Sequence, residues 1–258
     1  RLVSRGLGDV YKRQTLKKGW LFKMPKINKD STLNITFVGI GLCLLCSAII
    51  SFIAIQLRSV QENNVVLDMQ KKIVSSAGLD EVYGSVENAM SNIKTLIIDL
   101  DRGEIVDINP DTYELSKELR EDGKYKFLSA EEDVASIKKR EKYSKVYIEY
   151  KDNEINTLIL PVRGYGLWGI LYGYLAIEGD FNTVAGLEFY EHKETPGLGA
   201  EIDNPKWKAL WKGKKIYQEN GEVSLKVIKG SVMKTSDNFS YEIDGLSGAT
   251  LTLSLIHI

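Results

Sequence analysis

An apolar run extends from Ile35 to Leu57 and contains no charged residue. It is long enough to cross a hydrocarbon layer of roughly 30 Å as a helix. A cleaved signal peptide usually has a shorter apolar core, followed by small residues at a cleavage site. We therefore interpret the run as a retained transmembrane helix with bounds of 34–58.

The charges on the two sides of this run differ. Only Arg58 follows it closely, whereas three lysines precede it: Lys23, Lys26 and Lys29. Cytoplasmic flanks of membrane helices carry an excess of positive charge. The sequence therefore predicts a cytoplasmic N-terminus over residues 15–33 and an extracytoplasmic domain over residues 59–252.

After the membrane helix, the pattern changes to shorter apolar segments separated by turn residues. An imperfect apolar stripe from Val65 to Ala77 predicts a short helix that ends near Gly78. Alternation of apolar and polar positions predicts strands or hairpin partners at 95–100, 104–108, 146–150, 157–161, 168–178, 183–191 and 223–228.

Two further regions have helical or irregular character. The charged segment 114–145 is expected to form surface helix and loop, and 205–215 a helix capped by Asp203 or Asn204. Strands mixed with separate helices predict an α+β domain, with an antiparallel sheet and flanking helices.

Composition excludes some functions. The net charge of −1 and the isoelectric point near 6.3 do not indicate nucleic-acid binding. Both cysteines, Cys43 and Cys46, lie in the apolar run, where no His or Asp completes a metal site. Helix packing or lipid contact is the better interpretation of this pair.

Two glycine-rich turns carry the candidate chemistry. In the segment 244–250 (DGLSGAT), closely spaced glycines allow backbone N–H groups to approach a ligand and to form a concave site for phosphate. In 192–199 (HKETPGLG), a proline and two glycines define a second rigid turn, which would present Leu198 outward. Either motif alone would also fit an ordinary surface turn.

A third segment, 164–169 (GYGLWG), completes an ordered set of motifs. Together they resemble the C subunit of the sodium-translocating NADH:quinone oxidoreductase, from about Asp30 to Thr252. The G subunit of the Rnf electron-transport complex shares ETPGLG and SGAT, but GYGLWG favours the sodium-pump subunit. The resemblance implies FMN held through a phosphoester bond to the threonine that closes SGAT, which is Thr250.

The resemblance also implies which residues contact the cofactor. Trp168 and Leu198 would contact the isoalloxazine ring, Thr195 and Gly197 lie in the ring-binding turn, and Lys229 matches a lysine near the flavin. The phosphate end would be held by Ser247, Gly248, Ala249 and Thr250. Two alternatives remain open at this stage, because Trp168 could be a core aromatic and Lys229 a solvated lysine at a strand end.

The sequence shows no obvious base that would activate the Thr250 hydroxyl. The nearest carboxylate, Asp244, has turn capping as its alternative role. We therefore expect a separate flavin transferase, which the resemblance implies is Mg-dependent and uses FAD. The only plausible native histidine is His192, and no Ser-His-acid set is readable, so a stand-alone hydrolase is disfavoured.

The chain is thus expected to be an electron-carrier subunit of the NADH:quinone reductase in a bacterial inner membrane, and not catalytic alone. NADH and quinone would bind other subunits, since no Gly-rich dinucleotide fingerprint follows a strand here. The alternatives are an Rnf-type G subunit and a flavin-free scaffold subunit. Residues 1–14 and 253–258 resemble translated linker sequence, so we expect a non-native leader and tail around a truncated domain.

Overall fold

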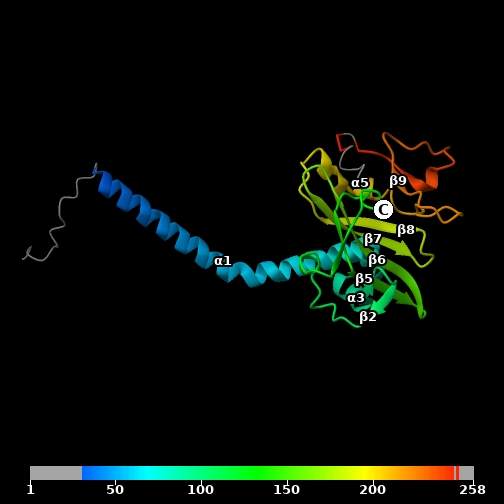
Figure 1. The fold of residues 1–258 in the computed structure, drawn as a ribbon, viewed down its shortest axis with the longest axis horizontal. Helices are drawn as coiled ribbons and strands as arrows, with labels where there is room; N and C mark the ends of the chain where they lie inside the picture. The colour runs from blue at the N-terminus through cyan, green and yellow to red at the C-terminus, as the bar shows by residue number, and fades with distance from the viewer. Residues whose placement is uncertain (1–30, 247, 250–258) are drawn as a thin grey trace, which may run out of the picture. The chain divides into compact units, whose positions relative to one another are not determined.

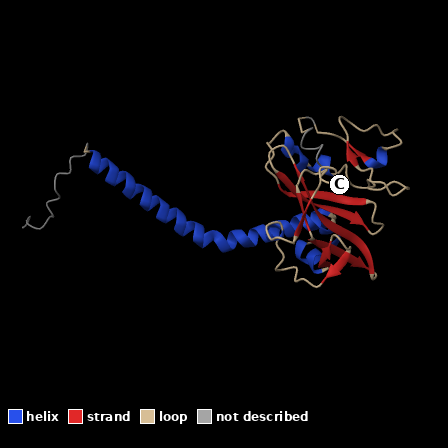
Figure 2. Ribbon diagram, in the orientation of Figure 1, coloured by secondary structure: helices blue, strands red, loops and turns tan. Residues whose placement is uncertain are grey.

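A computed structural model of the chain describes residues 31–246, 248 and 249. The chain divides into two compact units, residues 1–61 and 62–258, and the second unit contains the folded domain. Its architecture is an antiparallel sheet with helices, which confirms the predicted α+β class. Figure 2 shows the strands of this domain in red and its short helices in blue.

Helix α1 covers Thr32–Ser76. It is the one helix among the described residues that is long and apolar enough to cross a membrane, as the apolar run predicts. The helix predicted from Val65 onward is a continuation of α1 rather than a separate element. No glycine or proline stands between Leu57 and Ile73, so the sequence there contains no residue that would end the helix.

The domain is built on one six-stranded sheet with the order β2-β1-β5-β6-β7-β8, in which every neighbouring pair is antiparallel. Its strands are β1 (Ile93–Asp99), β2 (Glu104–Val106), β5 (Tyr143–Lys151), β6 (Glu154–Tyr165), β7 (Ile170–Glu178) and β8 (Val184–Glu191). The predicted hairpins of 95–108 and 146–161 are confirmed.

The two faces of the sheet form two separate cores, because successive side chains of a strand point to opposite faces. On β7, Leu171 and Leu175 pack into a cluster with Trp207 and Trp211, whereas Tyr174 packs into a second cluster with the end of α1. Figure 1 shows α5 and β9 near β8, and α3 near β5 and β2. We call the face with the Trp207 cluster the tryptophan face and the face with the Tyr174 cluster the tyrosine face.

Short elements complete the domain. Helices and 3₁₀ turns are α2 (Leu79–Tyr83), α3 (Val86–Ser91), α4 (Leu115–Glu118), η1 (Gly199–Asp203), α5 (Pro205–Lys208) and η2 (Phe239–Tyr241). The short strands are β3 (Tyr125–Phe127), β4 (Lys139–Glu141), β9 (Lys226–Val227) and β10 (Glu242–Ile243).

Three predictions about these short elements need correction. The segment 114–145 contains the antiparallel pair β3–β4 and the start of β5, although its charges predict only helix and loop. The helix predicted over 205–215 ends as α5 at Lys208. The strand predicted over 223–228 is only two residues long as β9, and it pairs in parallel with β10 outside the main sheet.

Candidate functional site

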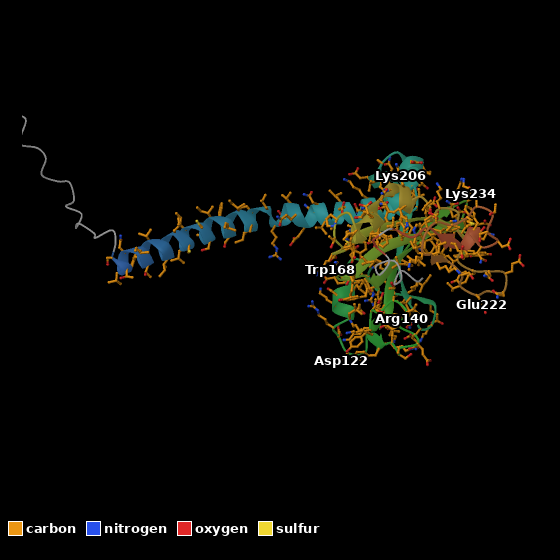
Figure 3. All side chains as sticks on the ribbon, turned by 90° about the horizontal axis from the view of Figure 1, so that it is seen from above. Asp122, Arg140, Trp168, Lys206, Glu222 and Lys234 are labelled. Atoms are coloured by element: carbon orange, nitrogen blue, oxygen red, sulfur yellow. The ribbon has the colours of Figure 1, made fainter. Side chains whose placement is uncertain are left out.

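The first candidate turn joins β6 to β7. Gly166 N–H donates to the carbonyl oxygen of Gly169 at 2.7 Å, which closes the turn around Trp168. The Trp168 side chain is 64% exposed, and Figure 3 labels it at the surface of the domain. The alternative of a core aromatic is therefore wrong, and the indole is available to a ligand or partner.

A buried carboxylate ties this turn to the second motif. Glu194 is only 6% exposed, and its Oε1 accepts the backbone N–H of Trp168 at 3.0 Å. A Cβ atom at Gly166 would lie 2.5 Å from the same oxygen, so a side chain there would push the carboxylate away from the Trp168 N–H. The sequence motifs do not single out Glu194 as a site residue. The available signal was an acidic residue directly before a Thr-Pro-Gly turn.

The second turn, which follows Glu194, has the geometry that its composition predicts. The carbonyl oxygen of Thr195 accepts N–H groups from Leu198 at 3.1 Å and from Ala200 at 3.2 Å. Gly197 has a φ of +76°, a conformation that residues with a Cβ rarely adopt. Leu198 is 49% exposed, so the turn presents it outward.

The structure brings the second turn against the segment near the C-terminus. A Cβ atom at Gly248 would lie 2.8 Å from Leu198 Cδ2, and the next residue, Ala249, is buried in the core of the tryptophan face. Two motifs far apart in sequence therefore meet at Leu198 and Gly248. Ser247 and Thr250 lie outside the described residues.

Asp244 organises the backbone just before this turn. Its Oδ1 accepts the N–H of Val232 at 2.7 Å, so the carboxylate joins two segments 12 residues apart rather than capping its own turn. Gly245 N–H donates to the carbonyl oxygen of Gly230 at 2.8 Å. Lys229, the residue before Gly230, is exposed, which fits a solvated strand-end lysine and equally leaves the ammonium accessible to an anion.

Helix α5 holds the backbone at Asp244 through a hydrogen bond from a buried side chain. Its N-terminus is capped by Asn204, whose side chain accepts the Lys206 N–H at 3.1 Å; of the two predicted caps, Asn204 is the one used. The indole Nε1–H of the buried Trp207 then donates to the carbonyl oxygen of Asp244 at 2.8 Å. The sequence predicts the helix, but not that its tryptophan holds the SGAT segment.

These residues fit a flavin better than a metal. Exposed Trp168 and Leu198 provide flat and branched apolar surface, Gly248 permits a close approach of the backbone, and Lys229 offers a nearby cation. Within the described ranges, no cluster of His, Cys, Asp and Glu could hold a metal ion. The exposed apolar side chains at these turns suit contact with a planar ring.

Comparison with known families agrees with this chemistry. Residues 166–257 match the sequence model of a family described as FMN-binding domain. The antiparallel fold, its paired glycine turns and this match define the class of the protein as an FMN-binding one.

Similar proteins of known family narrow this FMN-binding class to one family. The C subunit of the Na(+)-translocating NADH-quinone reductase of Pseudomonas aeruginosa is 46% identical over 87% of this chain and 88% of its own length. The corresponding subunit of Vibrio anguillarum is 41% identical over 87% of each chain. The chain belongs to the family of C subunits of the Na⁺-translocating NADH-quinone reductase, an oxidoreductase complex.

Solved structures share the fold. The crystal structure of Shewanella oneidensis NqrC matches with a TM-score of 0.64 and 30% identity, over 71% of this chain and 84% of that one. The structure of the C subunit from Parabacteroides distasonis matches with a TM-score of 0.54 and 29% identity, over 76% and 87% respectively. The resemblance stated from the motifs is thereby confirmed.

Proposed function

We propose that this chain is a membrane-anchored electron carrier, with one FMN bound covalently to Thr250 through a phosphoester. The observation that carries the proposal is the contact between Leu198 and Gly248, which brings the ETPGLG turn to within two residues of Thr250. The family membership supports FMN as the cofactor. The carrier would act within a Na⁺-translocating NADH:quinone reductase and would not be catalytic alone.

The protein's part is to position the flavin, while the isoalloxazine supplies the redox chemistry. Trp168 and Leu198 would hold the ring, with Thr195 and Gly197 forming the turn beneath it. Ser247, Gly248 and Ala249 would surround the phosphate end. Lys229 would stabilise a reduced, anionic ring by Coulomb attraction.

Attachment needs a separate flavin transferase. The hydroxyl oxygen of Thr250 would form a bond to the FMN phosphorus of FAD, AMP would leave, and the hydroxyl proton would pass to a base of the transferase. The carboxylate nearest in sequence, Asp244, is already engaged as the acceptor of the Val232 N–H. This supports a base outside the chain.

The proposed placement is a single span of the inner membrane by residues 34–58. Residues 15–33 would lie in the cytoplasm and residues 59–252 on the periplasmic side, following the excess of lysines before the span. An ester bond would keep FMN on the domain where no cytosolic pool could replace it. The partners would be the other subunits of the reductase.

The test is co-expression of the full chain with a flavin transferase, followed by flavin fluorescence in a denaturing gel and by mass spectrometry of the tryptic peptide. The unchanged chain and Ser247→Ala should carry FMN on the peptide that contains Thr250, and Thr250→Ala should carry none. Flavin fluorescence that survives Thr250→Ala would show that Thr250 is not the point of attachment. A colourless unchanged chain would instead favour a flavin-free scaffold subunit.

A further inference from the structure

A cavity of about 460 Å³ lies on the tyrosine face of the sheet, the face opposite the candidate flavin turns. Five of the chain's 13 tyrosines line it. They are Tyr113, Tyr147, Tyr172, Tyr174 and Tyr190. The volume falls in the range of small-molecule sites, roughly 300–1,000 Å³. Such a concentration of one aromatic residue type gives the cavity flat apolar walls that carry hydroxyl groups.

The tyrosine rings form a continuous aromatic wall. Tyr174 and Tyr190 are stacked with ring centroids 4.9 Å apart, Tyr172 follows at 5.9 Å from Tyr190, and Tyr147 meets Tyr174 edge to face at 5.8 Å. Offset and edge-to-face arrangements are favourable for aromatic pairs and would extend to a further planar ring. The wall is therefore preformed for a flat guest.

The carboxylates of the lining are already paired. Glu141 Oε2 binds the guanidinium of Arg163 at 2.5 Å, and Glu114 binds Lys117 at 2.8 Å. The carboxylates are therefore engaged within the protein, while the tyrosine and serine hydroxyls of the lining can still donate or accept hydrogen bonds.

Lys145 is different, because it lines the cavity with a half-buried ammonium. No carboxylate in the described part of the chain pairs with it. Its described contact is the Tyr113 ring, 5.7 Å from Nζ. Burial lowers the pKa of Lys145, and the weaker attraction of Asp111 only partly opposes this. A hydrogen-bond acceptor on a ligand would satisfy this donor.

We propose that this cavity binds a small planar ring ketone, stacked on the tyrosine wall and accepting a hydrogen bond at one carbonyl oxygen from Lys145. The walls select a flat apolar ring, and the free donor selects an oxygen acceptor. This site is separate from the flavin turns, since the sheet lies between the two cores. It does not depend on whether Thr250 carries FMN.

The experiment uses two probes with the same ring and the same four methyl groups. Duroquinone carries two carbonyl oxygens, and durene carries none. Each is titrated into the full chain in detergent micelles, and binding is followed by NMR of ¹³C-labelled tyrosine rings. Shifts of the cavity tyrosines are compared with those of Tyr125 and Tyr217, which do not line the cavity. This readout distinguishes the cavity from partition into the micelle.

Duroquinone should shift the signals of Tyr172, Tyr174 and Tyr190 saturably, and durene should bind at least about tenfold more weakly, because a hydrogen bond to a charged group is lost. Lys145→Met should reduce duroquinone affinity by a similar factor. The control Lys151→Met, at the exposed end of the same strand, should leave it unchanged.

Blocking the cavity provides a second variant that does not alter the buried wall. Ser116 lines the cavity from α4 and is exposed, so Ser116→Trp should fill the space and abolish the shifts without unfolding the domain. Equal binding of durene and duroquinone would overturn the proposal in favour of an unselective apolar void. Absence of saturable shifts up to the solubility limit of duroquinone would also overturn it.

Discussion

Leu198 Cδ2 lies against Gly248, 2.8 Å from the position that a Cβ atom would occupy there. The contact joins the turn after β8 to the turn just before Thr250. Gly248 has a φ of +81°, which favours glycine, and an added methyl group would also displace the Leu198 side chain. This is the point at which the two halves of the proposed flavin site meet.

The first prediction concerns this contact. Gly248→Ala should lower FMN incorporation roughly tenfold, because displacement of Leu198 by about 1 Å misplaces the ring-binding turn. The matched control is Gly221→Ala. Its φ of +80° imposes the same backbone strain, about 1–2 kcal/mol, but no atom lies within 4 Å of the added methyl group. The fraction of flavinylated chain is measured by intact mass, and equal loading of both variants would contradict the prediction.

The second prediction concerns the buried carboxylate of Glu194. Glu194→Ala removes the acceptor of the Trp168 N–H and should cost about 1–3 kcal/mol of unfolding free energy. Hydrogen exchange at the Trp168 amide should accelerate, which a general loss of packing elsewhere would not cause. Glu194→Gln keeps an acceptor oxygen and should lose less. Glu191→Ala, at the exposed end of β8, is the control. An unchanged rate of exchange at the Trp168 amide in Glu194→Ala would show that Glu194 does not hold this N–H.

Two neighbouring tryptophans supply the third prediction. Trp207→Phe removes the donor to the Asp244 carbonyl oxygen and should destabilise the domain by about 1–3 kcal/mol more than Trp211→Phe. Both side chains are buried, but Nε1 of Trp211 has no hydrogen-bond partner among the described residues. Urea unfolding of the two variants gives the comparison. Equal losses would show that only ring volume matters.

The fourth prediction concerns alkaline pH. Burial, followed by the neighbouring Tyr147 and Tyr190, raises the pKa of Tyr174 well above 10.0. The unfolded chain therefore releases this phenolic proton first. The stabilisation is complete below about pH 10 and is lost as pH rises from there toward the folded-state pKa, by up to about 1.4 kcal/mol per pH unit.

The measurement is the urea midpoint between about pH 8 and about pH 11, with tyrosinate absorbance as a second signal. Tyr174→Phe should show a shallower decline than the unchanged chain. Tyr125→Phe, outside the buried cluster, should decline as the unchanged chain does. An identical slope in all three proteins would show that Tyr174 does not contribute.

The hydrophobic pattern predicted the main sheet because the relevant information is local. Alternation along residues 146–150 and 157–161, with a turn between them, specifies a hairpin without reference to the rest of the chain. The continuity of α1 across Arg58 could also have been inferred, since no residue there ends a helix. The lengths of α5 and β9 could not, because packing against the sheet decides where such short elements end.

The same distinction between local pattern and long-range packing applies to the candidate site. Glycine spacing identified both turns, and the structure adds that Leu198 and Gly248 meet. Glu194 stands directly before a Thr-Pro-Gly turn, which is a local signal, but the partners of Glu194 and Trp207 lie 26 and 37 residues away in sequence and are set by the fold. Asp244 is an intermediate case, since capping is a local habit of aspartate, but its partner Val232 is set by the fold.

The alternation of side chains along β7 makes its length in residues a constraint on both halves of the domain. Leu175 faces the tryptophan core and Tyr174 faces the tyrosine wall. A single inserted or deleted residue in the middle of this strand would reverse every position beyond it. An indel just before Tyr174 would turn its phenol into the tryptophan core and Leu175 toward the tyrosine wall, so a change of one residue would disrupt both cores at once.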